Sequence, residues 1–219
     1  MTKLITRGGK LISRGGNLVG RPVPQPVGEY FEMIVKTDNA GTSDNDQFTI
    51  PTTGGGYDYT VETSEQLLTN QTGNVTLEWA SAGTHWVRIT GDFPRIFFNN
   101  DGDRLKLLEV SNWGDIQWSS MQMAFYGCSN FNITAADTPD LSNVMTMLSM
   151  FQDASSFNSD ISNWDVSSVT NMSSMFREAS SFNQDLSGWC VQQFGEQPFW
   201  FDRDANSWAL PRPNWGAPC

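Results

Sequence analysis

A tandem repeat of about 25 residues constrains the fold of this chain more than any other feature. The segment FQDASSFNSDISNW, residues 151–164, returns as FREASSFNQDLSGW at residues 176–189, and a shorter copy, FYGCSNFN, begins at residue 125. A period of this length is typical of one coil of a solenoid, and a coil covers its core only by stacking on its neighbours. The repeat therefore predicts a row of stacked coils.

The positions that recur from copy to copy define the expected core. Aromatic residues return at fixed spacing, and one small position holds Cys128, Ala154 or Ala179. An Asn follows an aromatic residue in each copy, where a buried amide side chain can bond the backbone of the adjacent coil. We interpret all of these residues as structural. The predicted repeat core consists of Phe125, Phe131, Asn132, Phe151, Phe157, Asn158, Trp164, Phe176, Phe182, Asn183 and Trp189.

Short strands are predicted before the repeat, between residues 29 and 91. Gly-, Asn- and Asp-rich turns separate apolar segments, and none of these segments has a helical period. This pattern is typical of a β-sandwich. The expected strands lie at residues 31–36, 48–50, 57–61, 75–79 and 86–89.

The last of these strands carry a resemblance to a known family. The segment WASAGTHWVRI, residues 79–89, resembles the closing hairpin of polycystic-kidney-disease (PKD)-type β-sandwiches. The WxxGDG motif usual in that family is replaced here by ETSEQ at residues 62–66. The resemblance implies a spacer or adhesion module.

A second resemblance covers the repeat. The segment VTNMSSMFREASSFNQDLSGW, residues 169–189, resembles the BspA-like leucine-rich-repeat surface proteins of bacteria and their viruses, and GDFPRIFFNNDG, residues 91–102, is similar to the segment that opens their repeats. The resemblance implies a short β-solenoid that displays a binding face, in adhesion or surface proteins rather than catalysts. The Trp- and Pro-rich residues 192–219 are then expected to cap the last coil.

These observations predict a mainly β chain in four parts. They are an extended arm over residues 1–28, a small β-sandwich over residues 29–91, a leucine-rich-repeat-like β-solenoid over residues 92–191 and a C-terminal cap over residues 192–219.

The first part is predicted to anchor the protein in an assembly. It repeats every seven residues with two glycines per unit, which weaken a helix by about 2 kcal/mol and favour short strands or an extended arm. Residues 1–21 contain five basic and no acidic residues, which leaves eight basic and 24 acidic residues in the rest of the chain. We expect the arm to dock on another subunit, with a solvated tail as the alternative. The basic residues concerned are Lys3, Arg7, Lys10, Arg14 and Arg21.

The cysteines and two acidic residues give the remaining site predictions. Cys190 ends the last full copy and Cys219 ends the chain, so we expect a disulfide that clamps the cap in an oxidising environment. Cys128 is expected to be a buried free thiol. Asp101 and Asp103 have the spacing of a calcium loop without its terminal Glu, so we favour a simple turn, with a calcium site as the alternative. We predict no other cofactor.

The composition excludes several classes of protein. Nine Trp and fourteen Phe are too many for an intrinsically disordered chain, and no run of about 18 apolar residues predicts a membrane-spanning helix. A formal net charge of −11 disfavours a nucleic-acid partner, because phosphate contacts need a basic face. One His and three Cys leave little for a metal site or a His-dependent active site. A non-enzymatic binding or structural protein is therefore favoured.

Three functions are compatible with these features. The first is a phage virion component, such as a capsid decoration, tail or fibre-associated subunit, which is anchored to other virion subunits by residues 1–28 and present as a homo-oligomer or in many copies. The alternative is a bacterial cell-surface leucine-rich-repeat adhesin that binds a host-surface glycan or protein. A remote alternative is a carbohydrate-active enzyme with Asp160 and Asp185 as paired carboxylates. The chain opens without a secretory leader, which favours the virion.

Overall fold

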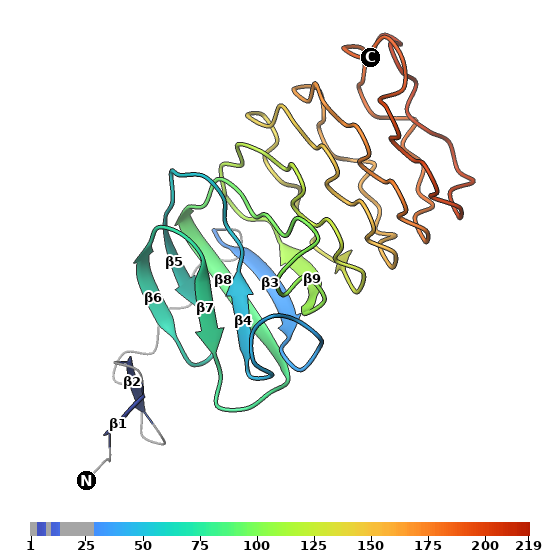
Figure 1. Ribbon diagram of the computed structural model, residues 1–219. Helices are drawn as coiled ribbons and strands as arrows, with labels where there is room; N and C mark the ends of the chain where they lie inside the picture. The colour runs from blue at the N-terminus through green and yellow to red at the C-terminus, as the bar shows by residue number, and fades with distance from the viewer. Residues whose placement is uncertain (1–3, 8–9, 14–28) are drawn as a thin grey trace.

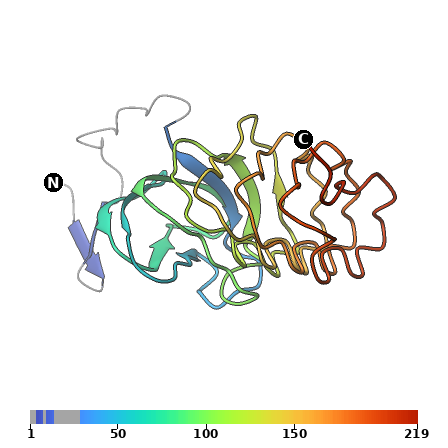
Figure 2. The ribbon, with the colours of Figure 1, turned by 90° about the horizontal axis from the view of Figure 1, so that it is seen from above.

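A sheet unit and a row of irregular coils make up the molecule (Figure 1 and Figure 2). The computed structural model describes residues 4–7, 10–13 and 29–219, with side chains from residue 29 onward. All regular secondary structure in these residues is β, which confirms the predicted mainly β class. The strands are β1 (Leu4–Arg7), β2 (Lys10–Ser13), β3 (Phe31–Lys36), β4 (Gln47–Ile50), β5 (Asp58–Glu62), β6 (Leu67–Gln71), β7 (Val75–Glu78), β8 (Thr84–Asp92), β9 (Leu107–Asn112) and β10 (Asn132–Ile133).

Most of the predicted anchoring arm lies outside the described residues. Its two described segments, β1 and β2, pair antiparallel, with Arg7 opposite Lys10. Lys3, Arg14 and Arg21 lie outside the described part of the chain. Docking of residues 1–28 on another subunit therefore stays a prediction.

Two sheets share one hydrophobic core. The larger sheet has six strands in the order β10-β9-β3-β8-β5-β6, with β9 and β10 as a parallel pair. β4 and β7 form a separate antiparallel pair. Buried residues alternate with less buried ones along β3, β4, β5 and β7, so each strand turns one face to the core. Buried side chains of both sheets belong to a single cluster.

The strands found in the structure both match and extend the predicted set. The five predicted strands correspond to β3, β4, β5, β7 and β8. β6 is an edge strand whose residues are exposed or half-buried, so its sequence has no alternating apolar pattern. β9 comes from the repeat region and pairs with β3 inside the sheet.

The boundary expected at residue 91 is not a structural break. β8 continues through it to Asp92, and the six-stranded sheet takes β9 and β10 from the segment assigned to the solenoid. The buried core also runs without interruption from the sheets into the coils. The six-stranded sheet therefore contains strands from both sides of residue 91, and the first coil continues directly from it.

A buried carboxylate fastens the start of the coils to the loop before β4. The side chains of Asp103 and Lys106 are 0% and 1% exposed, and Nζ of Lys106 lies 3.9 Å from Oδ1 of Asp103. Asp103 accepts hydrogen bonds from the backbone N–H groups of Thr42, Ser43 and Thr49 and from the Ser43 hydroxyl. These hydrogen bonds hold the pKa of Asp103 below its usual value despite the burial that raises it.

Lys106, rather than a calcium ion, is the cation that lies beside Asp103. Its ammonium group donates to the carbonyl oxygens of Ser43, Asp44 and Gln47, at 3.0, 2.8 and 3.0 Å. Protein donors already fill the carboxylate of Asp103, which disfavours the calcium alternative for this residue. Asp101 accepts from the N–H of the adjacent Gly102, at 2.7 Å, as expected of a turn. Within the described residues, no three His, Cys, Asp or Glu side chains are grouped to hold a metal ion.

On one side of the coils, the backbone hydrogen bonds between neighbouring coils run in one direction. Alternate residues donate their N–H groups to the next coil, and their carbonyl groups accept from turns inside the same coil, as Met147 does from Met150. The carbonyl groups between them, such as that of Met150, accept from the preceding coil. Two left-handed residues, four positions apart in each coil, aim these N–H groups to one side. The donors and acceptors are residues 121–127 to 146–152, residues 147–153 to 171–177, and residues 174–178 to 199–203.

Two columns of stacked phenylalanine rings fill the coils. Neighbouring rings within a column lie 5.6 to 5.8 Å apart. All six rings are fully buried, as predicted from their repetition. Trp164 and Trp189, 5% and 4% exposed, pack beside the first column. The columns hold Phe125, Phe151 and Phe176, and Phe131, Phe157 and Phe182.

The segment expected to be a cap begins with a further coil. Residues 199–203 accept the hydrogen bonds of the preceding coil, and the left-handed residues Trp200 and Asp204 continue its pattern. Trp208 meets the ends of both columns edge-on, 5.2 Å from Phe176 and 4.6 Å from Phe182. The aromatic residues therefore close the core as expected, while the backbone continues the coils.

None of the described residues forms a helix that is long and apolar enough to cross a membrane.

Candidate binding face

The side of the coils that carries the directional hydrogen bonds also carries side chains that differ between copies. We call it the ladder face, and it comprises residues 121–127, 147–153, 172–178 and 199–204. Core positions repeat between copies, but one ladder-face position holds the half-buried Tyr126, the buried Gln152 and the half-buried Arg177 in successive coils. Because the backbone is the same in each coil, these differences change only the chemistry that is displayed. Its polar and aromatic side chains include Tyr126, Asp153, Arg177, Glu178, Trp200 and Arg203.

Two arginines surround an exposed tryptophan at the C-terminal end of the ladder face. The guanidinium carbons of Arg177 and Arg203 lie 5.0 and 4.7 Å from the ring centroid of Trp200. Arg177 also donates to Glu178 at 2.7 Å. Phe199 stacks on Trp200 with ring centroids 4.4 Å apart. Cationic, anionic and aromatic groups are thus held together on a rigid backbone, a combination suited to polar ligands with an apolar face.

A pair of carboxylates in neighbouring coils is electrostatically perturbed. Burial, together with the hydrogen bond and the negative charge of Glu178, raises the pKa of Asp153 to about 6. The pKa of Glu178 is lowered by its hydrogen bonds with Asp153 and Arg177. The two groups therefore share a proton as the pH falls below neutrality.

The substitution Asp153→Asn is expected to stabilise the protein at neutral pH, because it removes a carboxylate that the fold disfavours in its ionised form. Because the folded-state pKa of Asp153 is raised, its stabilising contribution is complete below pH 4 and is lost as the pH rises through about 6. The variant should gain up to about 1 kcal/mol of unfolding free energy between pH 4 and pH 7, since solvent screens a half-exposed pair. Urea unfolding at several pH values measures this difference.

Asp185 is the matched control for that prediction. Its hydrogen bonds with Ser187 lower its pKa, so its contribution is present at neutral pH and lost as the pH falls. The Asp185→Asn variant should therefore lose stability at pH 7, the opposite sign. The same trend in both variants would contradict the assignment.

Asp160 and Asp185 are used by the turns that contain them. Oδ1 of each accepts from the N–H two residues later, in Ser162 and Ser187, at 2.9 Å. These hydrogen bonds lower the pKa of both carboxyl groups. A general acid for glycoside hydrolysis needs a raised pKa, so the structure gives these two residues a turn-forming role in place of the suggested catalytic pair.

The recurring asparagines form a ladder between coils. Oδ1 of Asn132 accepts from the N–H of Asn158 at 3.0 Å, and Oδ1 of Asn158 accepts from the N–H of Asn183 at 2.8 Å. Asn183 accepts from Ala209 and Leu210 of the last coil. The predicted bonding to the adjacent coil is present, but these side chains are exposed or half-buried rather than buried.

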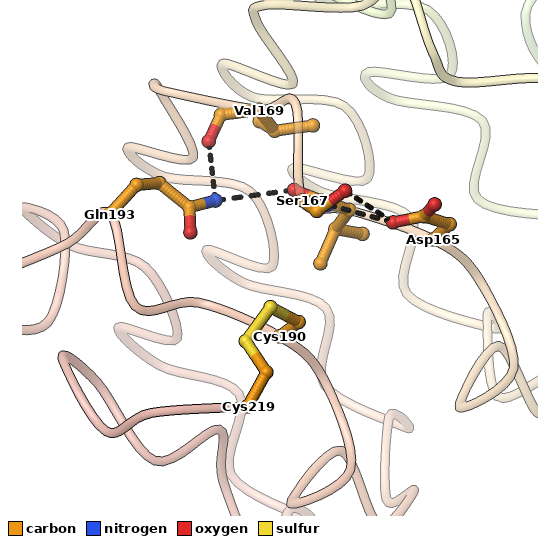
Figure 3. Close-up of a disulfide and its surroundings, with 7 residues drawn as sticks. Asp165, Ser167, Val169, Cys190, Gln193 and Cys219 are labelled. Atoms are coloured by element: carbon orange, nitrogen blue, oxygen red, sulfur yellow. Dashed lines mark hydrogen bonds between the residues drawn. A yellow bond between two sulfur atoms is a disulfide. The ribbon is translucent and has the colours of Figure 1, made fainter.

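A disulfide joins Cys190 to Cys219, with Cα atoms 5.3 Å apart (Figure 3). Close to it, Gln193 donates to the carbonyl oxygens of Val166 and Val169 of the preceding coil, at 3.2 and 2.7 Å. The disulfide attaches the C-terminal residue to Cys190, and the Gln193 side chain attaches the segment after Cys190 to the preceding coil. Cys128 is a buried free thiol, and burial raises its pKa well above the usual value.

Reduction of the disulfide is expected to destabilise the last coil. A loop of 29 residues is worth about 3 to 4 kcal/mol in chain entropy. Urea unfolding with and without reductant, and of the variant Cys219→Ser, should show this loss. A count of three free thiols in the denatured, unreduced chain would contradict it.

Sequence reasoning did not single out the ladder face. Repeat comparison draws attention to positions that stay the same, whereas Arg177 lies at a position that differs between copies. Trp200 and Arg203 lie in the last coil, where the offset changes from 25 to 26 and the motif is lost. Differences between copies at exposed repeat positions were the signal available.

Comparison with known proteins gives one match for the coils. The family model described as "Mycoplasma protein of unknown function, DUF285" matches residues 92–215. These residues include all of the coils and the first part of the segment expected to be a cap. No curated protein and no solved structure matches the chain. The PKD resemblance of residues 29–91 stays a prediction.

Proposed function

Because the chain belongs to the DUF285 family, we propose that it is a non-enzymatic binding protein of the bacterial cell surface, of leucine-rich-repeat type, which holds its ligand on the ladder face. The family match covers the coils, which carry the resemblance to surface proteins. It favours a cellular protein over a virion component, because neither the match nor the described residues contain a feature specific to virions. Most of residues 1–28, on which the virion hypothesis depends, lie outside the described part.

The observation that supports this proposal most is the contrast between repeated and varied positions. The phenylalanine columns and the asparagine ladder hold each coil in the same conformation. On that constant backbone the half-buried position of Tyr126 in one coil holds Arg177 two coils later. A scaffold that fixes the backbone and varies exposed side chains is suited to recognition, because the binding groups are already ordered before the ligand arrives.

The ligand class proposed is a host-surface glycan or protein. The aromatic ring of Trp200 between two guanidinium groups offers stacking and charge-assisted hydrogen bonds in one place. No catalytic role is proposed for the carboxylates, since Asp160 and Asp185 serve their own turns.

A binding panel tests the proposal. The whole chain is applied to arrays of host-surface glycans and extracellular-matrix proteins, and saturable binders are measured in solution. We expect Arg177→Ala to weaken binding at least about tenfold, as for a central interface residue. Lys36→Ala is the control, because its side chain is 40% exposed on the sheet unit against 30% for Arg177. Equal effects of both variants, or no saturable binder, would contradict the proposal.

A further inference from the structure

The last coil ends the ladder with a row of unpaired donors. The N–H groups of Trp200, Asp202 and Asp204 continue the row formed in the preceding coil by residues 174–178. No hydrogen-bond acceptor for any of the three N–H groups is found among the described residues. Trp200 and Asp204 have left-handed backbone conformations, the same as in earlier coils, so the row faces the side where another coil would lie.

Apolar side chains border this row. Phe199, Trp200 and Leu210 are 66%, 40% and 42% exposed and belong to the last coil. The nearest charges compensate each other, since Arg203 lies 3.3 Å from Asp204. Terminal coils of repeat proteins need a polar outer face, and open backbone edges are normally blocked. Here unpaired N–H groups and apolar surface occur together, which are the properties of a surface that is covered in use.

We propose that this edge, residues 199–204 and Leu210, docks an extended segment of another polypeptide. The segment supplies backbone carbonyl oxygens to the row of N–H groups and an apolar side chain to Phe199. This edge adjoins the ladder-face site and shares Trp200 and Arg203 with it. It goes beyond the function proposed above, because its backbone N–H groups recognise a peptide main chain.

The coils themselves identify the chemistry of the occupant. One step earlier, the same row at residues 174–178 is covered by the carbonyl groups of residues 199–203. Main-chain hydrogen bonds to an open edge give affinity, and side-chain pockets add specificity. The partner must therefore present a run of backbone acceptors, as an extended peptide does.

The stacked coils of a second copy do not fit the edge. Two last coils facing each other bring donors against donors, and N–H groups cannot pair with N–H groups. The opposite end of the coils is already covered, because Phe98 packs 6.3 Å from Phe48 and the N–H of Phe97 donates to Pro51. Neither end of the coils of a second copy can therefore cover the edge, and we assign it to an extended segment of a different protein.

A peptide that reproduces the natural cover of the preceding row tests this proposal. The probe is EQPFWFDRDANSWAL, residues 196–210, added to the intact, disulfide-bonded chain. We expect saturable binding of one peptide per chain, with slower amide hydrogen exchange at Trp200, Asp202 and Asp204. A scrambled peptide of the same composition should not bind. Absence of saturable binding, or protection confined to other amides, would overturn the proposal.

Two matched variants separate docking from general apolar adhesion. Phe199→Ser should weaken the peptide about tenfold or more, because it removes the apolar border of the row. Met145→Ser is the control, since Met145 is 64% exposed against 66% for Phe199 but lies on an interior coil. Equal losses would overturn the proposal. Neither measurement depends on the host ligand, so a failure here is distinguishable from a failure of the ladder-face function.

Discussion

Replacing Lys106 with Met is expected to lower the free energy of unfolding by about 3 to 5 kcal/mol. The substitution keeps the volume and the apolar stem but leaves Asp103 as an unpaired charge that is 0% exposed. It also removes the donor that serves the carbonyl oxygens of Ser43, Asp44 and Gln47. Urea unfolding followed by tryptophan fluorescence measures the loss.

The control for this variant is Lys36→Met, because the side chain of Lys36 is 40% exposed and pairs only with the nearby Asp38. We expect it to change stability by less than about 0.5 kcal/mol. The double variant Asp103→Asn with Lys106→Met should cost less than the sum of the single variants, because it removes both charges. A loss below about 1 kcal/mol for Lys106→Met would contradict the role of this pair in joining coils to sheets.

Replacing Phe151 with Ala is expected to cost about 3 to 5 kcal/mol. Phe151 is fully buried in the middle of the coils, with ring centroids of Phe125, Phe157 and Phe176 at 5.8, 4.0 and 5.6 Å. The cavity lies between two coils, so neither can collapse onto it without breaking the backbone hydrogen bonds of the other. Equilibrium unfolding in urea measures the effect.

Phe199→Ala is the matched control for the core variant. It removes the same atoms from a side chain that is 66% exposed, so we expect a change below about 0.5 kcal/mol. If Phe151→Ala were equally mild, the phenylalanine columns would not be the main source of stability in the coils.

The repeat made the core of the coils predictable because each coil must bury the same positions against its neighbour. Phe151 and Phe176 are recognisable by their spacing alone, and the structure places both in one column. The directional backbone ladder was not predictable in this way. It depends on left-handed residues such as Ser149, Asp153 and Glu178, which are not glycines and so carry no sequence signal for that conformation.

The joining of sheet and coils was also beyond the sequence. Asp103 and Lys106 are separated by about 60 residues from the groups that they bind at Ser43 and Thr49. Only the tertiary structure shows that the Lys106 ammonium group lies beside Asp103, where the sequence offered calcium as an alternative. The last coil was missed because its aromatic residues follow a different offset, so Trp208 takes over the role of a stacked phenylalanine.

The location of the protein tests the central claim most directly. Quantitative mass spectrometry is applied to purified cell envelopes and to purified virus particles from the same source culture. A protein that displays the ladder face to a host should be enriched in the envelope and should be cleaved when intact cells are treated with protease. Enrichment in virus particles at a constant number of copies per particle, with none in the envelope, would contradict the cell-surface function and favour the virion component.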